Sequence, residues 1–194
     1  YSGALCETNA APCFDGCTFS GNAVGAVLFG DKTMISKSRF IDNNVCGIRV
    51  IDGSQSKVTD CEITKCGCGI ECRAPVSTAP LFANCDIHTN LYAGILCSGY
   101  SRPTIRECNI HDHDEVAGVV VRCSALAKLE KCRVDANKVG ILCRLHGEVM
   151  CEHGTISDNR VGVTVEFSGI GTVKRCISKS NVNHSVLCRT QGNM

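Results

Sequence analysis

The chain has 194 residues, of which 17 are cysteine, 19 are glycine and none is tryptophan. Its 20 basic and 19 acidic residues leave a net charge of +1, which disfavours non-specific nucleic-acid binding because such binding needs a marked basic excess. No run of about 18 apolar residues occurs, so no membrane-spanning helix is predicted. These values fit one elongated soluble domain over residues 1–194, with no cofactor expected.

The predicted strands begin with a short phrase, glycine–aliphatic–variable–apolar, that recurs at intervals of 22 to 25 residues. Its copies begin at Gly3, Gly25, Gly47, Gly69, Gly94, Gly118, Gly140 and Gly162, with a degenerate copy at Ser185. A second phrase lies between successive copies, with an apolar residue, then cysteine, then an aliphatic or aromatic residue, then asparagine. Its apolar row is Phe14, Ile35, Val58, Phe82, Ile105, Leu129, Cys151 and Val173, and its cysteine row is Cys17, Ser38, Cys61, Cys85, Cys108, Cys132, Gly154 and Cys176.

Apolar and variable residues alternate within both phrases, as in a strand with one buried face, and no segment shows a helical apolar period. A repeat of this size with three short strands cannot bury its own apolar face, but stacked copies can. The sequence therefore predicts an all-β fold: a single-stranded right-handed parallel β-helix, a solenoid of about eight coils of 21–25 residues. One inward row is predicted to run Ala26, Ile48, Ile70, Ile95, Val119, Ile141, Val163, Val186.

The glycine row and the asparagine row both have structural interpretations. The recurrent glycine is expected to adopt a positive φ or to pass close to the neighbouring coil. The asparagines are expected to form a ladder of side-chain hydrogen bonds between coils, interrupted at Asp112 and His113.

The cysteines are odd in number and most fall at inward positions, where a free thiol packs as a small hydrophobe. This favours reduced cysteines and an intracellular location, cytoplasmic or nuclear. One local group, Cys46, Cys66, Cys68 and Cys72, raises the alternative of a zinc site, but its spacing lacks paired Cys-x-x-Cys motifs and no metal is expected.

Outward-facing residues carry the candidate sites. Successive coils are predicted to bring together a polar patch of Asp86, His88, Asn109, His111, Arg133 and Asp135. Histidines and carboxylates in such a patch suit binding of a divalent ion or acid–base chemistry on a sugar. A plain solvated sheet face is the alternative.

A second outward row is apolar and flanked by arginine, which is typical of a protein interface. The hypothesis is a partner-binding face formed by Leu96, Val120, Leu142, Arg122 and Arg144. The alternative is a loop or flanking segment folded over this row.

Residues 99–121, which run from GYSRPTIRECNIHD to GVVV, resemble the coil of CASH-type right-handed β-helix repeats. Such repeats occur in F-box proteins that recognise substrates for a ubiquitin ligase and in the Shc-binding mitotic, or central spindle, protein. The resemblance implies an adaptor or scaffold that binds a protein partner. The chain departs from the pattern in having cysteine where those repeats have asparagine, and no F-box segment is present.

The expected function is therefore a non-enzymatic protein-interaction module, with no nucleic acid or membrane as partner. The alternative is a carbohydrate-active lyase, hydrolase or epimerase, or a glycan-binding β-helix, as occurs in pectate-lyase-like relatives of the repeat. Against it, the chain has no tryptophan to stack on sugars and no long loops to form a cleft. Both ends lie within the repeat, so we expect a fragment of a longer chain or a homodimer formed through the coil ends.

Overall fold

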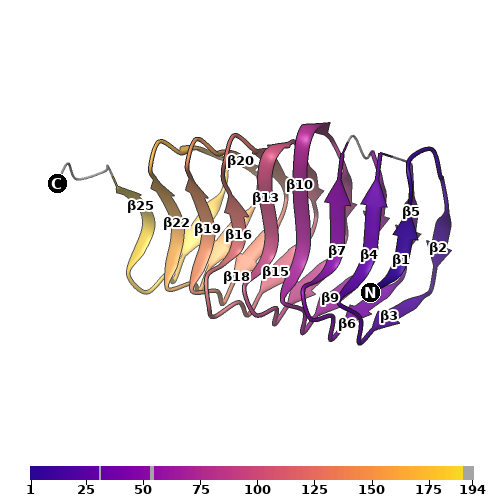
Figure 1. The fold of residues 1–194 in the computed structure, drawn as a ribbon. Helices are drawn as coiled ribbons and strands as arrows, with labels where there is room; N and C mark the ends of the chain where they lie inside the picture. The colour runs from indigo at the N-terminus through magenta and orange to yellow at the C-terminus, as the bar shows by residue number, and fades with distance from the viewer. Residues whose placement is uncertain (31, 53–54, 190–194) are drawn as a thin grey trace.

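A computed structural model describes residues 1–30, 32–52 and 55–189. The chain winds through three parallel sheets, visiting one strand of each sheet in every coil (Figure 1). Within each sheet, every strand except the two at its ends pairs with the equivalent strands of the coils before and after it. No helix that could cross a bilayer occurs in these residues. The predicted all-β solenoid of parallel coils is confirmed.

The bounds of the strands follow the coil repeat. Sheet A has nine strands: β1 Ser2–Cys6, β4 Val24–Phe29, β7 Cys46–Ile51, β10 Cys68–Thr78, β13 Ala93–Ser101, β16 Ala117–Val121, β19 Val139–Arg144, β22 Val161–Glu166 and β25 His184–Arg189. Sheet B has eight: β2 Cys13–Asp15, β5 Met34–Ser36, β8 Lys57–Thr59, β11 Leu81–Ala83, β14 Thr104–Arg106, β17 Leu126–Glu130, β20 Glu148–Glu152 and β23 Ile170–Lys174. Sheet C has eight: β3 Thr18–Ser20, β6 Arg39–Ile41, β9 Glu62–Thr64, β12 Asp86–His88, β15 Asn109–His111, β18 Arg133–Asp135, β21 Thr155–Ser157 and β24 Ile177–Lys179.

The observed register matches the predicted rows. Ile95 pairs with Ile70 on one side and with Val119 on the other, and all three side chains are fully buried. The apolar row of sheet B pairs in the same way, for example Phe82 with Ile105. These rows stack into one continuous core along the solenoid, so each coil buries its apolar side chains against its neighbours.

The glycine row exists because neighbouring coils approach each other closely. A Cβ atom at Gly47 would lie 2.8 Å from the carbonyl oxygen of Gly69 and 2.7 Å from Cγ2 of Ile63. Among the described glycines, only Gly16, Gly21, Gly30 and Gly99 have a positive φ, and none of these belongs to the row. Of the two reasons expected for the row, close approach is confirmed and positive φ is wrong.

Positive φ occurs instead at the corners of the solenoid. The residue directly before each member of the cysteine row is left-handed: Gly16, Lys37, Asp60, Asn84, Glu107, Lys131, His153 and Arg175. The residue directly before each member of the asparagine row is left-handed as well: Gly21, Asp42, Lys65, Thr89, Asp112, Ala136, Asp158 and Ser180. The side chain that follows then turns inward and binds the backbone of the bend. The Cys85 thiol, for example, contacts the carbonyl oxygens of Ala83 at 3.3 Å and of Val58 in the preceding coil at 3.6 Å.

The asparagine ladder is continuous where an interruption was expected. Its row includes His113, which is fully buried. Nδ1 of His113 donates to Oδ1 of Asn137 at 2.8 Å, and Nε2 accepts from Nδ2 of Asn90 at 3.3 Å. A neutral imidazole has one donor and one acceptor, so it replaces an amide in this position. Burial is the largest influence on this ring and lowers the pKa of His113 to about 4.

Candidate functional site

The three apolar residues of the predicted partner-binding face are buried. Leu96 and Leu142 are 7% exposed and Val120 is 0% exposed, so the expectation that they face water is wrong. They belong to a second apolar cluster outside the main core, the outer seam, whose buried members are Val24, Val27, Cys46, Cys68, Ala93, Leu96, Ala117, Val120 and Leu142.

The outer seam arises because strand alternation breaks at the glycine row. Val24 lies in the seam, whereas Ala26, two residues further on, lies in the main core. Residues two apart in a regular strand share a face, so the chain must bend at Gly25. The bend brings the Val24 row and the Val27 row together on the outside of sheet A. The residues that cover Leu96, Val120 and Leu142 thus come from sheet A itself, and a separate loop is not needed to explain their burial.

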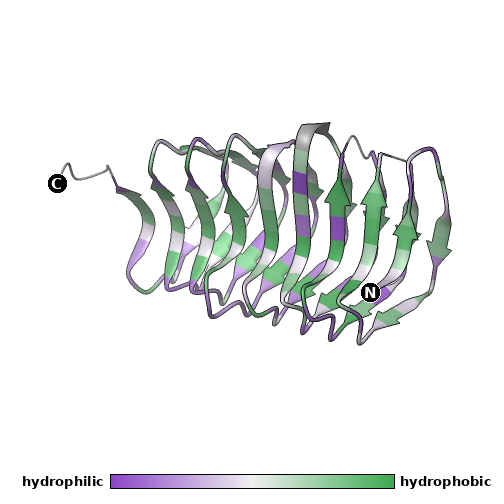
Figure 2. Cartoon of the chain, in the orientation of Figure 1, coloured by the Kyte–Doolittle hydropathy of each residue, from purple (hydrophilic) through white to green (hydrophobic). Residues whose placement is uncertain are grey.

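The arginines flank this seam on sheet A. The row beyond the seam places Arg73 next to Ser98 in the following coil, and Arg122 and Arg144 follow in the two coils after that. Arg73 is exposed, whereas Arg122 and Arg144 are partly exposed. Figure 2 shows hydrophilic bands on β7 and β10 in a sheet whose other strands are mainly hydrophobic.

A pocket of about 560 Å³ lies between Arg73 and Arg122. It is lined by Glu71, Arg73, Ala74, Ser98, Gly99, Arg122 and Cys123. The hollow exists because Ser98, which lies between the two arginines in their row, has a small side chain and the next residue, Gly99, has none. We call this hollow the arginine pocket.

Within the part of the chain that the structure describes, the two guanidinium groups of the arginine pocket, those of Arg73 and Arg122, have no ion-pair partner. Nε of Arg122 is buried without a hydrogen-bond partner, and so is Nε of Arg144 in the next coil. A buried donor without an acceptor is unfavourable by about 1–3 kcal/mol, so an anionic ligand would relieve this cost.

The only carboxylate lining the arginine pocket is already neutralised. Glu71 accepts from Nε of Arg49 at 2.7 Å, and both side chains are largely buried. The same arginine faces Cys46 in the outer seam, where burial raises the pKa of the thiol to about 12 although Arg49 lowers it. The Cys46 thiol is therefore not available as a proton donor near neutral pH.

The predicted polar patch is assembled on sheet C. Register places Asp86, Asn109 and Arg133 in one row, and it places His88, His111 and Asp135 in the next row. The rings of His88 and His111 stack with centroids 5.0 Å apart. Arg133, however, forms a bidentate pair with Asp135 of its own strand at 2.9 and 2.8 Å, so these two residues do not reach the histidines.

His111 is held between two carboxylates. Its Nε2 lies 3.0 Å from Oδ1 of Asp86 and its Nδ1 lies 2.6 Å from Oδ2 of Asp112. Burial lowers the pKa of His111, but the two carboxylates outweigh this effect and the pKa is raised overall. His88 contacts Glu62, whose pKa is lowered chiefly by its hydrogen bond with Arg39. Most charged groups of the patch are thus paired with one another, whereas Oδ1 of Asn109 is buried without a hydrogen-bond partner.

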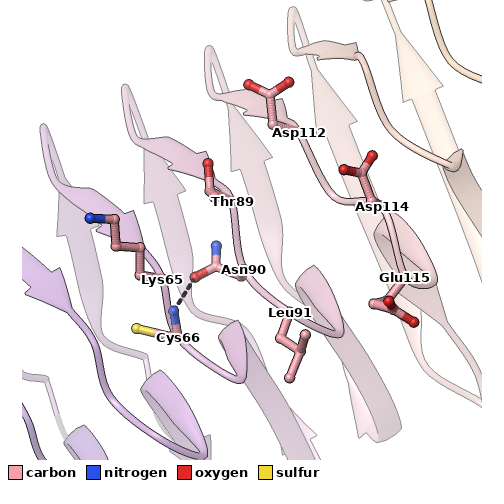
Figure 3. A pocket seen from close by; sticks show the side chains of 8 residues that line it. All are labelled: Lys65, Cys66, Thr89, Asn90, Leu91, Asp112, Asp114 and Glu115. Atoms are coloured by element: carbon pink, nitrogen blue, oxygen red, sulfur yellow. Dashed lines mark hydrogen bonds between the residues drawn. The ribbon is translucent and has the colours of Figure 1, made fainter.

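A smaller pocket of about 290 Å³ lies at the corner between sheets C and A (Figure 3). Lys65, Cys66, Thr89, Asn90, Leu91, Asp112, Asp114 and Glu115 line it. Its inner wall belongs to the asparagine ladder, since the backbone N–H of Cys66 donates to Oδ1 of Asn90 at 3.0 Å. Three acidic side chains of one coil, Asp112, Asp114 and Glu115, lie between β15 and β16 and form its rim.

The four cysteines considered as zinc ligands do not converge on one point. Cys72 lies in the main core, whereas Cys46 and Cys68 lie in the outer seam on the opposite face of sheet A. Cys66 occupies an asparagine-ladder position and accepts from Nδ2 of Asn43 at 3.7 Å. Across the described ranges, no cluster of histidine, cysteine or acidic side chains suits a metal ion.

The predicted partner-binding face included Arg122 but not Arg73, so the arginine pocket was not predicted. The available signal was the alternation of large basic and small residues along one outward row. The role of His113 was also missed, although its spacing from Asn90 and Asn137 matches the repeat.

Comparison with known proteins gives the fold family. The sequence matches the family described as "Right handed beta helix region" over residues 1–74 and 73–194. No curated protein matches the sequence. The A-module of the mannuronan C-5 epimerase AlgE4 from Azotobacter vinelandii is similar in structure, with a TM-score of 0.69 and 15% identity over 96% of this chain and 56% of that one.

Two further solved structures share the architecture. A double mutant of the periplasmic alginate epimerase AlgG gives a TM-score of 0.61 and 14% identity over 92% of this chain and 51% of that one. The A-module of the mannuronan C-5 epimerase AlgE6 from Azotobacter vinelandii gives a TM-score of 0.55 and 14% identity over 97% of this chain and 57% of that one. This chain thus spans little more than half of each of these structures, and at such identity the likeness concerns the fold alone. The closer resemblance to CASH-type F-box and Shc-binding proteins stays a prediction. The family match covers the whole chain, which therefore belongs to the right-handed β-helix family.

Proposed function

We propose that this domain is a non-catalytic recognition module that binds an acidic, extended segment of a protein partner in the arginine pocket of sheet A. The observation that carries the proposal is the pair of guanidinium groups, Arg73 and Arg122, on either side of a hollow of about 560 Å³. This proposal keeps Arg122 of the predicted partner-binding face, adds Arg73 and leaves out Arg144, which lies 3.9 Å from Glu166 and does not line the pocket. It omits the apolar part of that face because Leu96, Val120 and Leu142 are buried.

The chemistry of the ligand follows from the donors. A guanidinium group presents its N–H donors in a planar fork that matches a carboxylate and binds it with two hydrogen bonds. Arg73 and Arg122 stand two coils apart, which corresponds to about 10 Å at the spacing of neighbouring strands. Two acidic side chains on one extended chain suit this arrangement better than a single small anion does.

The lining of the pocket supports binding rather than catalysis. Acid–base catalysis needs a group that can exchange a proton near neutral pH. Glu71 is ion-paired with Arg49 at 2.7 Å, and no imidazole belongs to the lining. The histidines of the polar patch lie on sheet C, which is a different face of the solenoid.

An acidic polysaccharide is the second candidate ligand. Three solved structures that share the fold are epimerases of mannuronan or alginate, whose sugar units carry carboxylates. The same arginines would bind those carboxylates. This alternative was foreseen as a glycan-binding β-helix, and the test must separate it from a peptide ligand.

Fluorescence anisotropy with a labelled oligoglutamate peptide and a labelled oligomannuronate tests the proposal at physiological salt. Reversing the charge of both arginines, Arg73→Glu with Arg122→Glu, is expected to weaken peptide binding at least about tenfold, because opposed carboxylates replace two charge-assisted bonds. The control is Arg160→Glu with Arg175→Glu, which makes the same change in net charge at two exposed positions outside the pocket. Circular dichroism verifies that both variants fold.

Equal losses of peptide affinity in the two double variants would contradict a defined site, because they would indicate that net charge alone attracts the peptide. Binding of the oligomannuronate in preference to the peptide would favour the glycan alternative. Absence of binding by both probes would refute the proposal of an acidic ligand.

A further inference from the structure

The seventh coil departs from the repeat at two linked positions. Cys151 stands in the apolar row of sheet B, where the other coils have phenylalanine, leucine, isoleucine or valine. Gly154 stands in the cysteine row, where the following coil has Cys176. The seventh coil thus has a cysteine in its apolar row and a glycine in its cysteine row.

The two departures are complementary in space. A Cβ atom at Gly154 would lie 3.3 Å from Sγ of Cys151, so the thiol of Cys151 borders the space that a side chain at position 154 would enter. The thiol of Cys176 reaches the same space from the next coil. Its Sγ lies 3.6 Å from Sγ of Cys151 and accepts from the backbone N–H of Gly154 at 3.3 Å.

The two thiols differ in access to solvent. Cys151 is 1% exposed, and burial together with the neighbouring Cys176 raises its pKa. Cys176 is partly exposed. Other members of the cysteine row, namely Cys61, Cys85, Cys108 and Cys132, are each 2% exposed. A small oxidant in solution therefore reaches Cys176 before it reaches the buried thiols of the row.

We propose that Cys151 and Cys176 are a site of disulfide formation, which hydrogen peroxide or a related peroxide oxidises to a bond between the seventh and eighth coils. The thiolate of Cys176 attacks one peroxide oxygen and becomes a sulfenic acid, while the other oxygen leaves as hydroxide and takes up a proton. The sulfur of Cys151 then attacks the sulfenic sulfur, and its proton leaves with the hydroxyl group as water. Two thiols and one peroxide thus give one disulfide and two waters.

The disulfide would hold the eighth coil against the seventh. Among the residues that the structure describes, only the seventh coil packs against the eighth, and the inward residues Val173 and Val186 are 42% and 54% exposed. Elements with few buried contacts open most readily in native proteins. A cross-link from residue 151 to residue 176 restricts the open forms of this coil and therefore slows its opening.

Trypsin digestion after peroxide treatment and alkylation of free thiols gives a direct test. Cleavage after arginine and lysine leaves Cys151 as the single cysteine of residues 145–160 and Cys176 as the single cysteine of residues 176–179. The expected result is a species that joins these two peptides and disappears on reduction. Cys176→Ser and Cys151→Ser should each abolish it, and Cys123→Ser, at an exposed cysteine elsewhere, should leave it unchanged.

Hydrogen exchange measures the consequence. Amides of β24 and β25 should exchange at least about tenfold more slowly in the oxidised protein than in the reduced protein, with no such change in Cys151→Ser. The proposal would be overturned if peroxide oxidised Cys176 to sulfenic or higher acids without any joined peptide. It would be overturned equally if Cys176 joined another thiol in preference to Cys151.

Discussion

Replacing Asn137 by alanine tests whether the asparagine ladder stabilises the solenoid. Asn137 is 3% exposed and connects three coils. Its Oδ1 accepts from the backbone N–H of His113 at 3.1 Å and from Nδ1 of the same residue at 2.8 Å. Its Nδ2 donates to the carbonyl oxygen of Ile110 at 3.1 Å and to Oδ1 of Asn159 at 3.0 Å.

The expected cost follows from the groups that alanine leaves without partners. The backbone N–H and the Nδ1–H of His113 both lose their acceptor inside a fully buried environment. Each buried donor without a partner costs about 1–3 kcal/mol, so Asn137→Ala should lower the free energy of unfolding by about 2–6 kcal/mol. Oδ1 of Asn159 retains the backbone N–H of Asn137 at 3.0 Å and adds little to this cost.

Asn22→Ala is the matched control. Asn22 occupies the same row in the first coil, where it is partly exposed and its Nδ2 donates to Ser20 and Asn43. Water can replace those bonds, so the expected cost is below about 1 kcal/mol. Urea unfolding followed by circular dichroism measures both variants. If Asn137→Ala cost no more than Asn22→Ala, burial of the ladder would not determine its energetic contribution.

Two further predictions concern the core and pH. Ile95→Asp should unfold the domain because an unpaired carboxylate at a fully buried position costs several kcal/mol. The control Leu91→Asp, at a residue that is 69% exposed, should retain the melting temperature. An unchanged melting temperature of Ile95→Asp would refute the register. Because the pKa of His113 falls from 6.5 in the unfolded chain to about 4 in the fold, the unfolded state binds more protons between these values. The stabilisation is full above about pH 6.5, and about 3 kcal/mol is lost as the pH falls to about 4. In urea titrations at pH 7 and pH 4.5, His113→Asn should reduce the change of the unfolding free energy with pH. If this change were the same in the wild type and the variant, other titrating groups would be its cause.

The repeat was sufficient to predict the fold because the solenoid is built from contacts between equivalent residues of neighbouring coils. Ile95 must meet Ile70 and Val119 if the spacing of the phrase is kept, and these pairs are observed. The same reasoning predicted the cysteine row as packed thiols rather than disulfides, and all 17 cysteines are free.

The candidate site was predicted less well because sequence period does not reveal a bend within a strand. Strict alternation placed Leu96 and Val120 on an exposed face. The bend at the glycine row instead packs them against the Ala93 and Ala117 positions of the outer seam. Likewise, the polar patch was grouped correctly by register, but only side-chain geometry shows that Arg133 binds Asp135 instead of the histidines.

The sequence by itself determined the strand register, the inward rows and the stacking of coils, because each depends on a repeat length and a two-residue alternation that can be read from the chain. The tertiary structure alone decided which outward residues are accessible. Burial of the outer seam, the hollow at Ser98 between Arg73 and Arg122, and the contact between Cys151 and Cys176 depend on where strands bend and how side chains of different coils fill space. Such distances arise from packing between coils, which one-dimensional spacing does not specify.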